Sequence, residues 1–417
     1  MRRSKLVRIL GAGLMVVLVG AACRRPTTPP KPPEETKVPT TEAPKASTDT
    51  AAAKLRTDLN NLLSEHVYLS ALATGAALRG DTKAFGAWAD VLNGKGPSNS
   101  TDLISAIGGA YGDQVQTAFD PLWRKHIGFV VSYTQGIAAG DKAKSDKAVK
   151  DLTDYAAEFG AVMESVNGLP KDTVKDLVMA HILTLKDAID AQKAKDQPKV
   201  YSGLRKAYGH MSMIATPLAA ATAAKTGKFP GDVQSAAAGL RAALNTNLRE
   251  HVLLSASAAG AALRGDNAAF MAAADALNGM GSSNSTDLIN AVGSVYGDQV
   301  KTAFDPLWRK HIGFVVTYVQ GVGANDKAKS EKAVADLTAY AAEFGAVMES
   351  VNGLPKDIVK ELVTTHILTL KGVIDDAKAG DAAKTATGLR AAVGHMGTIA
   401  DPLAKATVDK FPAKFAS

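Results

Sequence analysis

Apolar side chains recur along most of the chain at intervals of three and four residues, the periodicity of a helix with one buried face. In residues 51–79 they form such a stripe, and the same pattern predicts further helices at residues 82–93, 101–111, 113–139, 142–166, 172–195 and 199–225. No stretch of useful length alternates between apolar and polar residues as a strand would. The pattern therefore predicts an all-α protein.

Two features set the expected helix ends. In Arg79-Gly80-Asp81 a basic residue closes one helix, glycine follows its end, and aspartate can cap the next helix. This helix-end pattern explains the Arg-Gly-Asp tripeptide without an adhesion receptor. Within residues 113–139, Pro121 follows Asp120. Either Asp120 caps a new helix with Pro121 at its first position, or the proline kinks a continuous helix.

The helical pattern is written twice. Residues 122–131 recur without change at 307–316, and the same offset of 185 aligns the chain without a gap over most of each copy. A first copy at 51–230 and a second copy at 231–417 are each large enough for a core. We expect two tandem antiparallel helical bundles, each with four or five long helices and two short crossover helices.

The first 22 residues have the features of a secretory signal peptide, with a basic start, an apolar segment at 9–20 and small residues before Cys23. Cys23 is the only cysteine, so no intramolecular disulfide can form. A cysteine in this position is similar to the lipidated cysteine of bacterial lipoproteins. The resemblance implies export and anchoring by Cys23 to the outer face of the cytoplasmic membrane, at the cell surface.

Composition and charge indicate a tether and limit the partners to be expected. Residues 23–50 contain seven prolines and few apolar residues, which predicts an extended tether. The formal charge of +7 falls to about +3 without the signal peptide. Because this excess is small and no basic stripe is interleaved with aromatic residues, nucleic acid is not an expected partner.

All eight histidines belong to the repeated pattern. Each copy places one near the middle of each of four long helices, on the apolar stripe: His66, His126, His181 and His210 in the first copy, and His251, His311, His366 and His395 in the second. Antiparallel helices of similar length bring their midpoints to one level. The four histidines of a copy can therefore converge on one point.

Buried imidazoles without partners are unfavourable, and binding to a metal would offset that cost. Imidazole suits copper and zinc, and four of them can form a tetrahedral site. We therefore expect one metal site per copy, with a role in metal sequestration or electron transfer. Two alternatives stay open: haem b held non-covalently between histidines, and a surface scaffold or adhesion module whose histidines only fix the helix register.

Other polar side chains and a methionine near the histidines could orient the ligands or join them. Because Met211 directly follows His210, copper is slightly favoured over zinc. The candidates are Glu65, Ser70, Tyr133, Glu158, Thr184 and Met211, with their copies Glu250, Ser255, Tyr318, Glu343, Thr369 and Met396. Glu65 lies about 100° around the helix from His66, which points it towards solvent or a neighbouring helix.

The sequence offers no nucleophile for catalysis, because it has no Gly-x-Ser-x-Gly motif, no phosphate-binding glycine loop and no His-Glu-x-x-His motif. The segments 65–69, 126–133 and 209–213, together with His181, resemble a family of exported bacterial helical domains. Some relatives in that family carry the label copper amine oxidase. The resemblance implies that the histidine positions are a family signature. The chain has no Asn-Tyr pair from which an amine oxidase quinone cofactor could form, so amine oxidase activity is not expected.

Overall fold

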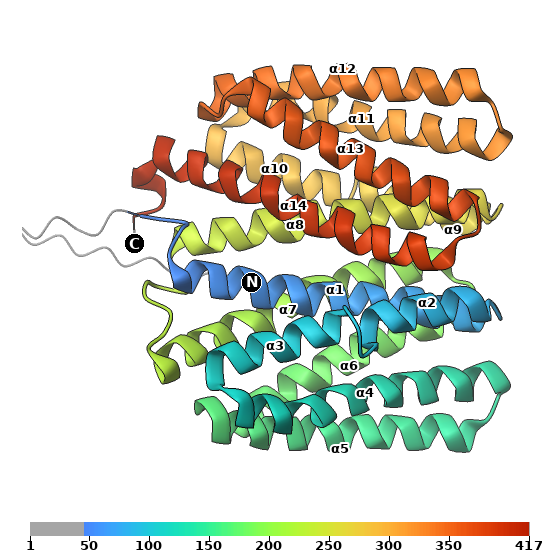
Figure 1. Ribbon diagram of the computed structural model, residues 1–417, viewed down its shortest axis with the longest axis vertical. Helices are drawn as coiled ribbons and strands as arrows, with labels where there is room; N and C mark the ends of the chain where they lie inside the picture. Colours follow the sequence, from blue (N-terminus) through green and yellow to red (C-terminus); the bar gives the residue numbers. More distant parts are fainter. Residues whose placement is uncertain (1–45, 417) are drawn as a thin grey trace, which may run out of the picture. The chain divides into compact units, whose positions relative to one another are not determined.

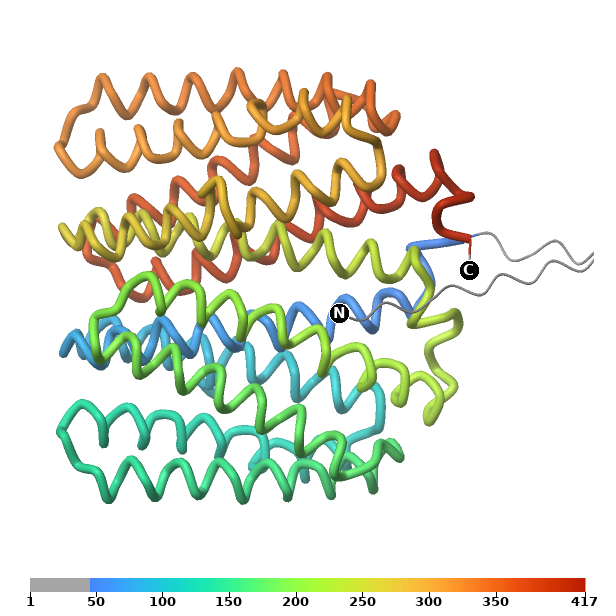
Figure 2. Tube along the Cα trace, turned by 180° about the vertical axis from the view of Figure 1, so that it is seen from behind, coloured from blue at the N-terminus to red at the C-terminus, as the bar shows by residue number. Residues whose placement is uncertain are grey.

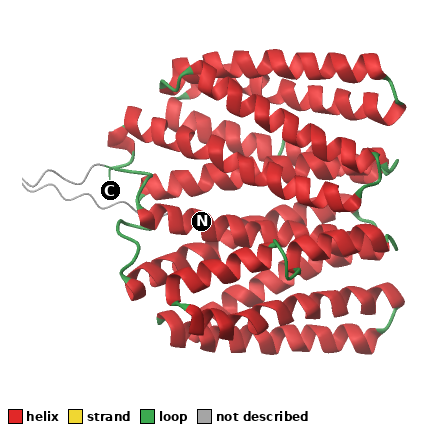
Figure 3. Cartoon of the chain, viewed as in Figure 1, coloured by secondary structure: helices red, strands yellow, loops and turns green. Residues whose placement is uncertain are grey.

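The computed structural model describes residues 46–416, and within them the regular structure is helical (Figures 1 and 3). The first copy contains α1 (Ala51–Leu78), α2 (Thr82–Asn93), α3 (Asn99–Tyr111), α4 (Asp113–Ala139), α5 (Lys142–Asn167), α6 (Lys171–Ala194) and α7 (Gln197–Thr226). No strand occurs among residues 46–416. The predicted all-α class is confirmed, with five long and two short helices in this copy.

The second copy repeats this arrangement. It contains α8 (Ala236–Leu263), α9 (Asn267–Asn278), α10 (Asn284–Tyr296), α11 (Asp298–Ala324), α12 (Lys327–Asn352), α13 (Lys356–Lys378) and α14 (Ala382–Lys410), followed by the short η1 (Pro412–Lys414). Most of these bounds equal those of the first copy shifted by 185 residues, and the ends of α13 and α14 differ by one residue. The same local sequence signals therefore set the helix ends in both copies.

The predicted helix-end signals are confirmed where the structure describes them. Arg79 is the C-cap of α1, Gly80 has a φ of +75°, and the Asp81 carboxylate accepts a hydrogen bond of 2.9 Å from the Ala84 backbone N–H. α4 runs continuously through Pro121, so no new helix begins there. The Asp120 carboxylate binds Arg124 one turn later instead of capping a new helix.

The two copies pack into one compact unit. α1 and α8 lie side by side at its centre, α2 packs against α14, and α9 packs against α7 (Figures 1 and 2). The hairpins formed by α4 with α5 and by α11 with α12 lie at opposite outer edges. Buried apolar side chains of both copies belong to one continuous core. Each copy therefore helps to bury apolar side chains of the other.

Charged side chains also join the copies. The carboxylate of Glu65 in α1 accepts hydrogen bonds of 3.1 Å from Nε and Nη2 of Arg390 in α14. The related pair in the other direction is Arg205 in α7 with Glu250 in α8, at 3.2 Å. Both glutamates are buried. Glu65 thus faces a neighbouring helix, one of the two orientations expected from its position.

The expected signal peptide, the lipidated Cys23 and most of the proline-rich tether lie outside the described residues. Among the helices of residues 46–416, none is both long and apolar enough to span a membrane.

One glycine marks a close approach of two helices. A Cβ atom added to Gly136 in α4 would lie 2.7 Å from the backbone nitrogen of Ser145 in α5. We expect Gly136→Ala to lower the free energy of unfolding by about 1–3 kcal/mol, because backbone atoms of α4 and α5 must separate. Gly128→Ala in the same helix is the control: nothing lies within 4 Å of its Cβ position, and removing a helical glycine should stabilise by up to about 1 kcal/mol. Urea unfolding at equal protein concentration measures both, and equal effects would contradict the prediction.

Candidate functional site

Three of the four predicted histidines of each copy meet in the core. In the first copy His66 of α1 lies between His126 of α4 and His181 of α6, with ring centroids 5.2 Å and 5.9 Å away. In the second copy His251 lies 5.2 Å from His311 and 5.8 Å from His366. We call these two groups the histidine clusters. Because the spacing is nearly the same in both copies, it follows from the shared sequence and packing.

Within each cluster, the Nε2 atoms of two imidazole rings lie close together. Nε2 of His66 lies 3.4 Å from Nε2 of His126, and the same atoms of His251 and His311 are also 3.4 Å apart. This distance is long for a hydrogen bond. Two nitrogens that bind the same tetrahedral metal ion at 2.0–2.1 Å would lie about 3.3–3.4 Å apart.

Aromatic side chains enclose the cluster on one side. The Trp123 ring lies 4.6 Å from the His126 ring, and Tyr155 of α5 stacks on His126 at 4.8 Å. The indole N–H of Trp123 donates to the Ser100 hydroxyl at 3.1 Å, which holds the ring in place. Neither Trp123 nor Tyr155 is among the site residues expected from the sequence. The sequence signal for Tyr155 is its position one turn before Phe159 on an apolar helix face.

The fourth histidine of each copy stays outside the cluster. His210 of α7 is half-buried, and its Nε2 donates to the Leu177 carbonyl at 3.0 Å. His395 makes the same bond to Leu362, also at 3.0 Å, and its Nδ1 lies 3.2 Å from the Thr398 hydroxyl. The structure therefore brings together three of the four histidines in each copy. The fourth is engaged by the backbone of the adjacent helix.

Burial keeps the clustered imidazoles neutral. It lowers the pKa of His126 to about 3 and that of His181 to about 4, and a neighbouring histidine adds to each effect. Burial also holds the pKa of His66 well below its usual value, with His126 and His181 contributing. The second copy shows the same directions. A neutral imidazole keeps a lone pair on one ring nitrogen, which is the state that binds a metal.

The clusters also contain buried nitrogens that lack partners. Within residues 46–416, Nδ1 of His66 and of His181 has no hydrogen-bond partner, and the same is true of His251 and His366. In the second copy Nδ1 of His311 contacts the Trp308 carbonyl. An unpaired buried polar group is unfavourable by roughly 1–3 kcal/mol. A group of three or more histidine, cysteine or acidic side chains already arranged to hold a metal ion is not found among the described residues.

Most of the other predicted site residues bond elsewhere. Tyr133 and Tyr318 donate to Asp190 and Asp375, while Glu158 and Glu343 pair with Lys125 and Lys310. Thr184 and Thr369 donate to the carbonyls of His181 and His366 at 2.9 Å, and Ser255 donates to that of His251 at 2.7 Å. Ser70, Met211 and Met396 are buried. The hydroxyls of Thr184 and Thr369 bind helix backbone rather than the imidazole rings.

In the second copy the cluster borders an apolar cavity of about 90 Å³. Its wall includes the three histidines together with Trp308, Tyr340 and Met396. A cavity of this size has room for a few small atoms beside the imidazoles but is far smaller than the roughly 300–1,000 Å³ typical of cofactor sites.

Comparisons of the chain with protein-family models, with curated proteins and with solved structures gave no match.

Proposed function

We propose that the protein is a lipid-anchored, extracytoplasmic metal-binding protein in which each histidine cluster binds one copper or zinc ion, for sequestration or electron transfer. The observation that carries this proposal is the 3.4 Å separation of two buried Nε2 atoms in both copies. A single tetrahedral ion between them would account for that distance. The anchor rests on Cys23 and the preceding signal sequence.

The donor chemistry supports a single ion. Neutral imidazoles suit copper and zinc, and burial keeps these rings neutral. His66 and His126 would be two ligands, and His181, whose ring centroid lies 5.9 Å from that of His66, would be the third. The cavity of about 90 Å³ beside the second cluster favours an ion over haem b, which needs a pocket several times larger.

The duplicated chain offers its own control for a test. We expect the full-length protein, stripped with chelator, to bind two equivalents of Zn²⁺ or Cu⁺ per chain. His126→Phe and His311→Phe should each reduce this to one equivalent, because each removes a ligand from one cluster only. Phenylalanine keeps the stacking on Tyr155 or Tyr340, so the fold should persist. Isothermal titration and elemental analysis measure the stoichiometry.

The structural alternative gives a different result. If the histidines only fix the helix register, the stripped protein binds neither ion stoichiometrically, and both phenylalanine variants behave like the original chain in titration. That result, or an unchanged stoichiometry of two in both variants, would reject the metal-binding proposal.

A further inference from the structure

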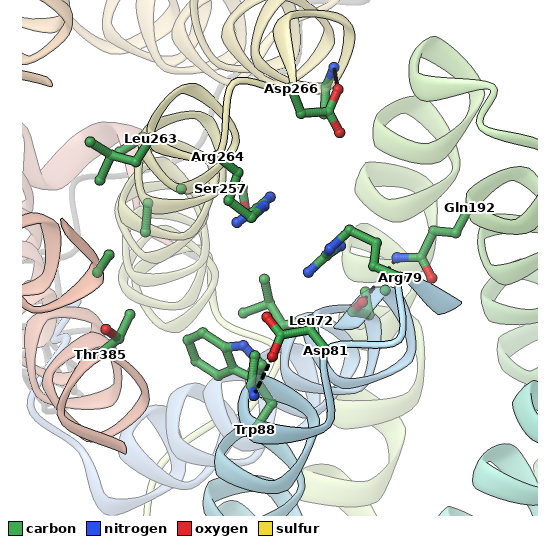
Figure 4. Close-up of a pocket in the computed structure, with 18 of the residues that line it drawn as sticks. Leu72, Arg79, Asp81, Trp88, Gln192, Ser257, Leu263, Arg264, Asp266 and Thr385 are labelled. Carbon is green, nitrogen blue, oxygen red and sulfur yellow. Dashed lines mark hydrogen bonds between the residues drawn. The ribbon is translucent and has the colours of Figure 1, made fainter. Parts of the chain in front are cut away.

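A second candidate site lies where the two copies meet. Residues from the ends of α1 and α8, together with parts of α2, α6, α7, α9, α13 and α14, line a pocket of about 1020 Å³ (Figure 4). This volume is at the upper end of the range for small-molecule sites, roughly 300–1,000 Å³. Arg79 follows His66 by 13 residues of helix, which places the pocket about 20 Å along α1 from the first histidine cluster.

Two arginines face each other across this pocket. Arg79 and Arg264 are the C-cap residues of α1 and α8, and their guanidinium groups extend into the same space from opposite sides (Figure 4). Neither side chain has a carboxylate partner among residues 46–416. Burial lowers the pKa of Arg79, and the charge of Arg264 lowers it further, against smaller opposing effects of Asp81 and Asp266, so the two cations repel each other. An anion between them would relieve that repulsion.

Glycines leave room for each arginine side chain in this position. A Cβ atom on Gly75 would lie 3.2 Å from Nη1 of Arg79, and one on Gly260 would lie 3.1 Å from Nη1 of Arg264. A Cβ atom at either glycine would make the guanidinium shift by a few tenths of an ångström. Both copies therefore keep the space that lets the arginine fold back over its own helix.

The acidic residues of the pocket are already engaged. Asp81 and Asp266 cap α2 and α9 by accepting hydrogen bonds of 2.9 Å and 3.0 Å from backbone N–H groups. Six basic and two acidic side chains line the pocket, so its charge is positive. Three of the six are occupied: Lys83, Lys193 and Lys378 donate to the carbonyls of Gly380, Ala138 and Gly323 at 2.9, 3.2 and 3.0 Å. The two arginines remain as the natural partners of an oxyanion.

The two copies contribute different side chains to the pocket. The first copy contributes Trp88, Gln192 and Tyr201, whereas the equivalent positions in the second copy hold alanine: Ala273, Ala377 and Ala386. Burial raises the pKa of Tyr201 to about 12, and the charges of Arg264 and Arg79 oppose that rise, so the phenol lies close to both cations. The pocket thus combines the two arginines with two aromatic side chains, Trp88 and Tyr201, that come from the first copy alone.

We propose that this pocket binds a small anion with a planar or apolar body, whose carboxylate or phosphate group lies between Arg79 and Arg264. The body packs against the lining of the pocket, whose aromatic side chains are Trp88 and Tyr201. Planar guanidinium groups bind such oxyanions through paired hydrogen bonds.

Isothermal titration of the full-length protein tests this with four probes: phenyl phosphate, benzoate, inorganic phosphate and neutral benzyl alcohol. We expect one phenyl phosphate or benzoate to bind per chain, inorganic phosphate to bind more weakly, and benzyl alcohol not to bind. Which of the two aromatic anions binds more tightly identifies the anionic group. Arg79→Gln and Arg264→Gln should each weaken binding about tenfold or more, since each removes a charged hydrogen-bonding partner.

Two further variants distinguish binding in the pocket from a general attraction of anions to the positively charged protein. Ala377→Gln places in the second copy the side chain that Gln192 supplies in the first, at a residue that lines the pocket, and should narrow the space and weaken binding. Lys327→Ala removes a charge from a side chain that is 85% exposed on another helix, and should leave binding unchanged. The proposal is overturned if neither aromatic anion binds saturably at millimolar concentration. It is also overturned if both arginine variants bind as the Lys327→Ala protein does while retaining a native circular dichroism spectrum.

Discussion

Lowering the pH from 7.5 to 5 is expected to unfold the metal-free protein or leave it close to unfolding. The native state holds six clustered imidazoles neutral, with the pKa of His126 and His311 lowered to about 3 and that of His181 and His366 to about 4. In the unfolded chain each binds a proton near its ordinary pKa of about 6.5. The unfolded state therefore gains protons first, and stability falls as the pH drops below that value.

The size of the effect follows from proton linkage. At pH 5 each of the four imidazoles of His126, His181, His311 and His366 lowers the free energy of unfolding by about 2 kcal/mol, on the order of 8 kcal/mol together. His66 and His251 act in the same direction. Domains are typically stable by roughly 5–15 kcal/mol. Urea unfolding at pH 7.5, 6.5 and 5.5 in the presence of chelator measures the slope, and circular dichroism at decreasing pH locates the acid transition.

The double variant His126→Phe with His311→Phe isolates the histidine contribution. It removes two of the six imidazoles, so the loss of stability at pH 5 should be smaller by about 4 kcal/mol. Carboxyl groups titrate equally in both proteins and cancel in the comparison. An unchanged dependence on pH would mean that His126 and His311 are protonated in the native state, against the direction of their pKa shifts.

Arg390→Ala is expected to lower the free energy of unfolding by about 3–5 kcal/mol, because it leaves the Glu65 carboxylate buried without its charged partner. Glu65 is 6% exposed, and its remaining side-chain hydrogen bond comes from Asn99 at 2.9 Å. Arg205→Ala should have a similar effect through Glu250, which Asn284 also binds at 2.9 Å. Urea unfolding at pH 7.5 measures both variants.

An exposed ion pair provides the matched control. Lys142 pairs with Asp146, and the two side chains are 84% and 62% exposed, so Lys142→Ala should change stability by no more than about 1 kcal/mol. Replacing Glu65 by Leu and Arg390 by Met together should recover most of the loss, because the buried carboxylate is then removed together with its partner. If Arg390→Ala is no more damaging than Lys142→Ala, the ion pair between the copies does not stabilise the fold.

Local signals were enough for nearly every helix. Arg79-Gly80-Asp81 predicts where α1 ends and where α2 begins, and both observed positions lie within one residue of the prediction. The start of α3 was predicted at residue 101, but the helix begins at Asn99 because the Ser98 hydroxyl accepts a hydrogen bond from the Thr101 backbone N–H. The surrounding Asn and Ser residues had the composition of a loop, which hid this cap.

The sequence by itself determined the helices, their repetition and the placement of every histidine on an apolar stripe, because these depend on contacts three or four residues apart. The tertiary structure decided which side chains meet. It turned His210 towards the Leu177 carbonyl instead of His66, placed Glu65 against Arg390 of the other copy, and opened a pocket between Arg79 and Arg264. These outcomes depend on how helices rotate and slide against one another, and the local periodicity of one helix leaves both free.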